Sequence, residues 1–328
     1  MIPKDKQVNF YAIPDQKAAD PAYKYGMDLI KQGDWEYGFY LHELRSLPDL
    51  RYPQGVKTDF AKTPVWIPGM NCVGKNAIVW SEAGWGDMLQ FSRFIPLLKD
   101  AGLKSVKLLF PTPMVRMLKR LPNHDGFFLP KESFPGAVKI KVMSLPYFLM
   151  EHKVIPAHPV KKIYGSEGIY RNPEIVKPSR EKPLIGYCYT TLNNSWNMKM
   201  KQMPKELMDN FIKQHPEFDW VSLQQSDGFI TSDRWSDTAD LIQTLDGVVS
   251  VDSAIAHCAG SVGVPVANLI GQENLACWRW HPKGEKTYWY DSMKTVWFNT
   301  WTEGLEEAIK HFKVEKKNKQ TKRKKEVA

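Results

Sequence analysis

The chain has 328 residues, a net charge of +9 at neutral pH and 43% hydrophobic residues, which allows two domains with their own cores. No apolar run approaches the roughly 20 residues of a membrane-spanning helix, and residues 1–10 lack the apolar core of a signal peptide. We therefore expect a soluble protein of the cytoplasm. The four cysteines have no metal-site spacing, which predicts free thiols rather than disulfides: Cys72, Cys188, Cys258 and Cys277.

Residues 1–75 are expected to form a helical hairpin and an irregular linker. Within residues 22–45, two helical patterns are separated by Gly33 and Asp34, and such a pair must bury a face against another part of the protein. Four prolines between residues 46 and 75 then predict an irregular connection.

Strands and helices alternate from residue 77 onward, which predicts a parallel sheet covered on both faces. The expected order is a strand at 77–80, a glycine turn at 81–87, a helix at 88–102, a strand at 105–110, a helix at 111–121, and short strands at 126–130 and 139–144. Prolines, glycines and charges at 156–182 break this rhythm. We therefore place an N-terminal Rossmann-like domain at 76–170.

A second alternating series predicts a C-terminal Rossmann-like domain at 180–312. Its expected elements are strands at 183–190, 220–224 and 295–299, helices at 204–216 and 238–247, and the strand-helix-strand unit 248–268. Thr300 and Glu303 have the spacing of a capping box for a last helix. The predicted fold class is α/β, with two doubly wound halves and a crevice that suits a nucleotide.

The positive charge is concentrated in residues 313–328, where eight Lys or Arg stand against two Glu. Such a segment cannot bury enough apolar surface to fold, so we expect a disordered basic tail. Charge alone specifies little, and no specific nucleic acid is expected. A solvated terminus is the favoured interpretation. Weak attraction to an anionic membrane surface, which would make the protein peripheral at the inner membrane face, stays open.

The unit 248–268 carries the clearest candidate site. Asp252 and Ser253 end an apolar run and are predicted to accept hydrogen bonds from the first amides of the following helix, beginning at Ala254. A helix start of this kind attracts phosphate. His257 lies one turn further on the same helix face. The same pattern also fits an ordinary strand, cap and helix with one buried histidine.

In combination, several stretches resemble the glycosyltransferase family 9-like proteins, which include the heptosyltransferases, and especially the members with tetratricopeptide repeats. The resemblance covers residues 22–312. It rests on QGDWEYGFYLHELR, which looks like the end of a repeat array, on the turn SEAGWGD, on DTADLIQTLDGVVSVDSAIAH and on WRWHPKGEKTYWYDSMKTVWF. The resemblance implies a GT-B fold with two facing Rossmann-like domains. It also implies an inverting transferase that uses a nucleotide-diphospho-sugar without a bound metal or other cofactor.

The resemblance assigns roles by position. Asp87 stands where the family has its presumed general base, Gly84 and Gly86 would let the backbone approach the sugar, and Glu82 is an alternate base. On the donor side it implies phosphate or nucleotide contacts from Thr190, Thr191, Lys201, Gln224, Asp252, Ser253, Ala254 and His257. Simpler interpretations stay open: Asp87 as an N-cap, Lys201 as a solvated lysine, Gln224 as a polar strand end, and Thr238 as the N-cap of the helix after Asp237.

Five aromatic residues could line a sugar groove, although such a density is more typical of a core: Trp278, Trp280, Tyr288, Trp289 and Tyr290. The sugar, the base and the acceptor, whether a glycan, a lipid-linked sugar or a protein, are left open. Two rival functions also stay open: a non-catalytic sugar-nucleotide-binding or scaffold protein, and a sugar-nucleotide epimerase. A dehydrogenase is disfavoured because no G-x-G-x-x-G follows a strand.

Overall fold

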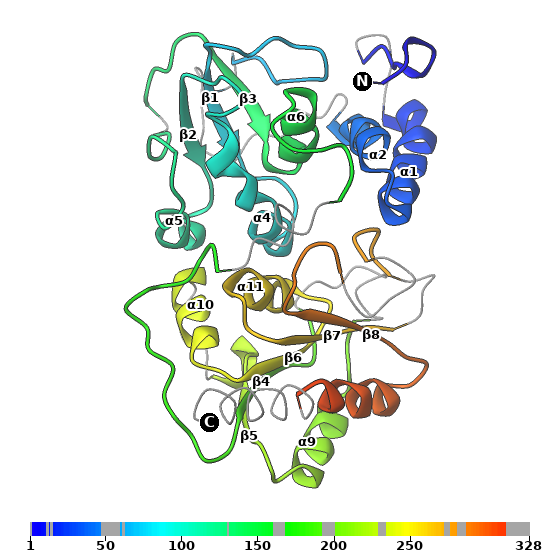
Figure 1. Cartoon of the computed structure of the whole chain (residues 1–328), viewed down its shortest axis with the longest axis vertical. Coiled ribbons are helices and arrows are strands. Elements are labelled where there is room, and N and C mark those ends of the chain that lie inside the picture. Colours follow the sequence, from blue (N-terminus) through cyan, green and yellow to red (C-terminus); the bar gives the residue numbers. More distant parts are fainter. Residues whose placement is uncertain are drawn as a thin grey trace, which may run out of the picture. The chain divides into compact units, whose positions relative to one another are not determined.

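The computed structural model of the chain forms two compact units, Met1–Tyr164 and Gly165–Ala328, and each is considered by itself (Figure 1). The structure describes residues 2–10, 13, 16–46, 60, 63–129, 131–159, 168–191, 201–228, 234–271, 276–280 and 287–312. The predicted tail 313–328 lies outside these residues. Within them, no helix is both long and apolar enough to cross a bilayer.

The N-terminal unit is organised around a parallel sheet of three strands in the order β2-β1-β3. The strands are β1 (Asn76–Trp80), β2 (Ser105–Leu109) and β3 (Ala137–Lys141). Asn76 pairs with both Ser105 and Ala137, so the three strands start level and their carboxyl ends share one edge. The predicted strands at 77–80 and 105–110 are confirmed.

The predicted strand at 126–130 is wrong. Gly126 has a φ of 92°, which turns the chain, and only Phe127 forms an isolated bridge, to Leu108. The strand expected at 139–144 is displaced, since β3 ends at Lys141 and a 3-10 turn leads from there into α6 (Leu145–Glu151).

The helix predicted at 88–102 is shorter and starts earlier. The α-helix α4 spans Trp85–Phe91, and a 3-10 helix follows over Ser92–Leu97. Pro96 has no N–H to donate and its ring crowds the preceding turn, so α-helical bonding cannot continue past it. The next helix, α5 (Thr112–Leu118), lies inside its predicted range.

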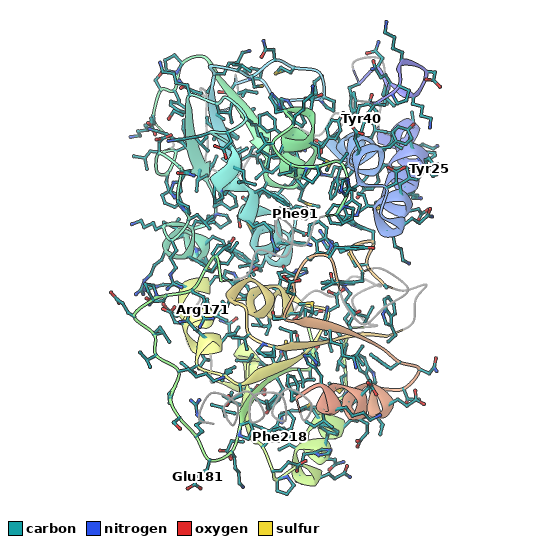
Figure 2. The ribbon with its side chains drawn as sticks, in the orientation of Figure 1. Tyr25, Tyr40, Phe91, Arg171, Glu181 and Phe218 are labelled. Carbon is teal, nitrogen blue, oxygen red and sulfur yellow. The ribbon has the colours of Figure 1, made fainter. Side chains whose placement is uncertain are left out.

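The N-terminal helical hairpin is confirmed as α1 (Gln16–Gln32) and α2 (Trp35–His42). Its two helices approach closely at glycines, because a Cβ on Gly38 would lie 2.9 Å from the carbonyl oxygen of Gly26. Figure 2 shows Tyr25 and Tyr40 on this hairpin. The Tyr40 ring packs 5.4 Å from the ring of Tyr147 on α6, so the hairpin is joined to the sheet unit through α6.

The C-terminal unit has a parallel sheet of five strands in the order β5-β4-β6-β7-β8. The strands are β4 (Leu184–Cys188), β5 (Asp219–Ser222), β6 (Gly247–Val251), β7 (Val266–Gly271) and β8 (Met293–Trp297). Figure 1 shows α10 (Trp235–Gln243) and α11 (Ala254–Val262) on one face, and α9 (Lys205–Gln214) with the helix 301–312 on the other. Helices on both faces of a parallel sheet confirm the α/β fold class.

Apolar side chains fill the layer between the sheet and the pair formed by α9 and helix 301–312. Phe211 on α9, Phe312 on the last helix and Val249 on β6 belong to one buried cluster, and Phe218 joins it beside β5 (Figure 2). Gly247 starts β6 and does not end a helix, contrary to the prediction. A Cβ there would lie 2.4 Å from the Phe312 ring, so only glycine fits under that ring.

Two predicted caps in this unit had opposite outcomes. The capping box is confirmed: the Glu303 amide donates to Thr300 Oγ1 at 3.3 Å, and the Thr300 amide donates to Glu303 Oε2 at 3.2 Å. The prediction of Thr238 as an N-cap is wrong, because α10 starts at Trp235 with Arg234 as its N-cap. The four cysteines are free thiols, as predicted.

Candidate functional site

The carboxyl edge of the C-terminal sheet gathers three predicted segments. Tyr187 on β4 pairs with Ser222 on β5, and Cys188 pairs with Ser250 on β6, so these three strands end side by side. The residues that follow the strand ends therefore meet at this edge. They are Thr190 and Thr191 after β4, Gln224 after β5, and Asp252 and Ser253 after β6.

Gln224 links the ends of β5 and β4. Its side-chain carbonyl oxygen accepts hydrogen bonds from the Cys188 thiol at 2.8 Å and from the Thr190 amide at 3.3 Å. Gln224 therefore fixes the strand end that carries the two threonines. The Thr191 hydroxyl is buried and has no hydrogen-bond partner among the residues that the structure describes. A buried hydroxyl in that state costs about 1–3 kcal/mol until a partner reaches it.

The start of α11 differs from the predicted cap. Ser253 is the N-cap residue, but its side chain makes no hydrogen bond to the first helical amides. Its hydroxyl instead bonds the Ser250 hydroxyl at 2.9 Å. The prediction of a side-chain cap from Ser253 is therefore wrong. Ala254 starts the helix, and the first bond is from the His257 amide to the Ser253 carbonyl.

Asp252 is held by Lys201 in a buried ion pair. The Lys201 Nζ lies 2.5 Å from Asp252 Oδ2, and only 17% and 7% of the two side chains are exposed. Burial would raise the pKa of Asp252, but Lys201 and His257 hold it below the ordinary value. Burial would likewise lower the pKa of Lys201, and Asp252 raises it above the ordinary value. The ammonium group that the sequence assigns to phosphate is thus bonded to a carboxylate.

His257 is fixed by two aromatic neighbours. Its Nδ1 shares a hydrogen bond of 2.9 Å with the Tyr290 hydroxyl, and its ring stacks on Trp280 at 5.4 Å. Trp280, Trp289 and Tyr290 are fully buried, which agrees with the interpretation of these aromatics as core. Trp278 and Tyr288 keep part of their surface exposed.

In the N-terminal unit, Asp87 lies in the first turn of α4, at the carboxyl end of β1. Its Oδ2 accepts a hydrogen bond of 2.8 Å from the Gly84 amide. Gly84 is the N-cap, so the interpretation of Asp87 as the N-cap is wrong, although Asp87 does stabilise the turn. Ala83 adopts a left-handed φ of 61°, which is costly for a residue with a Cβ. Gly86 follows Trp85, which is exposed, in the same turn.

Glu82 is less accessible to an acceptor hydroxyl than Asp87, because both of its oxygens already accept hydrogen bonds. Arg45 donates to Oε1 at 2.6 Å and to Oε2 at 3.2 Å, and the Met143 amide donates to Oε1 at 3.1 Å. Arg45 also bonds Glu43 at 2.9 Å and the Ser144 hydroxyl at 3.0 Å. The two carboxylates raise the pKa of this buried guanidinium above its ordinary value, against the effect of burial.

Sequence reasoning missed this network around Arg45, which ties the helical hairpin to the turn before α4. Ser144 and Arg45 are 99 positions apart, and nothing in the local pattern of either residue points to the other. Sequence reasoning also gave no role to Arg279, and it treated Cys188 only as a free thiol and Tyr290 only as a groove or core aromatic. Across the described part of the chain, no group of three or more His, Cys, Asp or Glu side chains could hold a metal ion.

Comparison with known proteins gives similarities to solved structures only, since neither a family model nor a curated protein matches the chain. One is the glycosyl transferase family 9 protein from Veillonella parvula DSM 2008, with 12% identity and a TM-score of 0.45 over 71% of this chain and 88% of that one. A second is the E. coli ADP-heptose lps heptosyltransferase II, with 12% identity and a TM-score of 0.44 over 74% of this chain and 99% of that one. A third is the iron-containing dodecameric glycosyltransferase TibC from enterotoxigenic E. coli H10407, with 10% identity and a TM-score of 0.44 over 61% and 59%.

Proposed function

We propose that the chain is a glycosyltransferase that moves a sugar from a nucleotide-diphospho-sugar to a hydroxyl of a glycan, lipid-linked or protein acceptor. The reaction inverts the anomeric centre and uses no metal. One observation supports the proposal most strongly. The start of α11, the Asp252–Lys201 pair and the buried Thr191 hydroxyl lie together at one edge of the sheet. Such an edge of a parallel sheet is where open α/β folds bind phosphorylated ligands.

The donor binds through its diphosphate at this edge. The first amides of a helix have no acceptor within the helix, and the helix dipole adds about half a positive charge at the same place. The backbone amides from Ser253 and Ala254 onward therefore donate hydrogen bonds to the phosphate oxygens, and the hydroxyls of Thr190 and Thr191 donate further ones. Gln224 orients the strand end toward the base or ribose, and His257 braces the helix start through Tyr290.

We assign the base of the transfer step to Asp87, which stands where the resembled family has its presumed general base. The acceptor oxygen forms a bond to the anomeric carbon while its proton passes to the Asp87 carboxylate. The bond from that carbon to the diphosphate breaks, and its electron pair leaves with the diphosphate through an oxocarbenium-like state. Gly84 and Gly86 leave space beside the carboxylate because they carry no side chain.

A panel of sugar nucleotides tests the proposal directly. Each is incubated with the full chain, with and without glycan acceptors, and released nucleoside diphosphate and glycoside are measured by mass spectrometry. The proposal predicts release that depends on acceptor and that falls at least about a hundredfold in Asp87→Asn, as expected for loss of a catalytic base. Binding without turnover would favour the non-catalytic function. Conversion of the donor without acceptor would favour the epimerase, and transfer undiminished in Asp87→Asn would remove the role given to Asp87.

A further inference from the structure

The short segment before Trp280 brings a second cation to the start of α11. Trp280 is fully buried and stacks on His257, which lies in the first turns of that helix. Arg279 is the adjacent residue, and its backbone carbonyl accepts a hydrogen bond of 3.0 Å from the indole N–H of the buried Trp289. The backbone of Arg279 is thus held by Trp289 and by the buried Trp280, which packs against the start of α11.

The side chain of Arg279 is also oriented. Its guanidinium carbon lies over the Trp278 ring, 4.3 Å from the ring centre, and this cation–π contact restrains the group. One of its N–H groups donates to the Cys277 sulfur at 2.9 Å. Thiols are weak acceptors, so a phosphate oxygen would replace this contact with a stronger, charge-assisted one.

The two cations differ in the group that each presents. Lys201 bonds the carboxylate directly, and this partner offsets its charge. Arg279 is close enough for its charge to act on Lys201, where it works against the rise in the pKa of that amine. A second positive group therefore lies within electrostatic range of the pair, and it is the planar guanidinium, which can bind two phosphate oxygens at once.

We propose that Arg279 is the cation that binds the diphosphate of the nucleotide ligand, while Lys201 serves to hold Asp252 in place. The inference rests on the proposed function, because it concerns the same donor site. It differs from the expectation drawn from the sequence, which gave the phosphate contact to Lys201 and no role to Arg279.

Calorimetric titration of the full-length protein tests this assignment. The probes are ADP, GDP, UDP and CDP, followed by the matching nucleoside and by inorganic pyrophosphate. Arg279→Gln should weaken binding of the preferred diphosphate at least about tenfold, the range of a lost charge-assisted contact, and leave nucleoside binding unchanged. Arg171→Gln is the matched control, since Arg171 is an exposed arginine of the same unit (Figure 2), and it should bind like the natural protein.

Arg279→Lys provides the second variant, because it keeps the charge if Arg279→Gln does not fold. An ammonium group cannot make the paired contact, so we expect a loss of about threefold or more for the diphosphate and for pyrophosphate. Diphosphate affinity within twofold of the natural protein in a folded Arg279 variant would overturn the inference and leave the proposed function standing. Equal losses for nucleoside and diphosphate would also overturn it, since they indicate a structural effect. No diphosphate binding by the natural protein would overturn both.

Discussion

The Asp252–Lys201 pair predicts a large loss of stability when only one partner is removed. Lys201→Met keeps an unbranched side chain of similar length but leaves the Asp252 carboxylate buried without its cation. Removing one partner of a buried ion pair costs about 3–5 kcal/mol. Because 17% of the Lys201 side chain is exposed, water can partly solvate the site. We therefore expect a loss of stability at the lower end of this range, about 3 kcal/mol.

The assay is urea and thermal unfolding followed by circular dichroism. In a unit of this size each kcal/mol shifts the midpoint by about 2–4 °C, so Lys201→Met should melt about 6–12 °C lower. The double variant Lys201→Met/Asp252→Asn leaves no unpaired charge and should recover about 2 kcal/mol of the loss, within the usual range for residues in contact. Lys205→Met is the control, because Lys205 pairs with Asp209 on the exposed surface of α9, and it should hardly change the midpoint. A Lys201→Met midpoint equal to that control would show that the buried Asp252 carboxylate does not depend on Lys201 for stability.

Three further predictions concern the same unit. Lys201 and His257 hold the folded pKa of Asp252 below its ordinary value of about 3.8, so this carboxylate stabilises the fold above that pH and its contribution is lost as the pH falls through the folded pKa. Urea melts from pH 7 to about pH 2 should show a loss of stability, and the loss should be smaller in Asp252→Asn. Gly247→Ala places a Cβ 2.4 Å from the Phe312 ring and should lower the free energy of unfolding by about 1–3 kcal/mol. Gly228→Ala is the control, because a Cβ there meets nothing within 4 Å and adds backbone strain alone, so its loss of stability should be smaller. Burial raises the pKa of the Cys188 thiol, so in the native protein at pH 8 iodoacetamide should label the half-buried Cys277 well before Cys188. The labelling rates are measured by peptide mass spectrometry, and equal rates for the two thiols would contradict this expectation.

Much of the fold follows from local pattern. The apolar run that ends at Asp252 and Ser253 predicts β6 and α11, and the Thr300–Glu303 spacing predicts the last cap, because each signal lies within a few residues. The element boundaries that were predicted wrongly are those determined by a distant contact or by a single proline. Pro96 ends α-helical bonding after α4, and the ring of Phe312 explains why a glycine stands at 247, which the local pattern had placed at the end of a helix.

The sequence predicts which residues belong to the candidate site, but not which partners those residues bond. The order of strands brings Gln224, Thr190 and Asp252 to one edge, and the alternating pattern already indicates such an edge. The partners of these residues were not predictable, because they depend on contacts across long stretches of chain. Lys201 and Asp252 are 51 positions apart, and His257 and Tyr290 are 33 apart. Nothing in the local sequence shows that Arg45 occupies both oxygens of Glu82.

Calorimetric titration of the full chain with nucleoside diphosphates is the most direct test of the proposed donor site. A ligand that contacts the start of α11 through its phosphates should bind as the diphosphate and much more weakly as the nucleoside. We expect saturable binding of at least one of ADP, GDP, UDP and CDP in the micromolar range, where about 8 kcal/mol of binding energy is gained. Absence of binding by all four at millimolar concentration would contradict it.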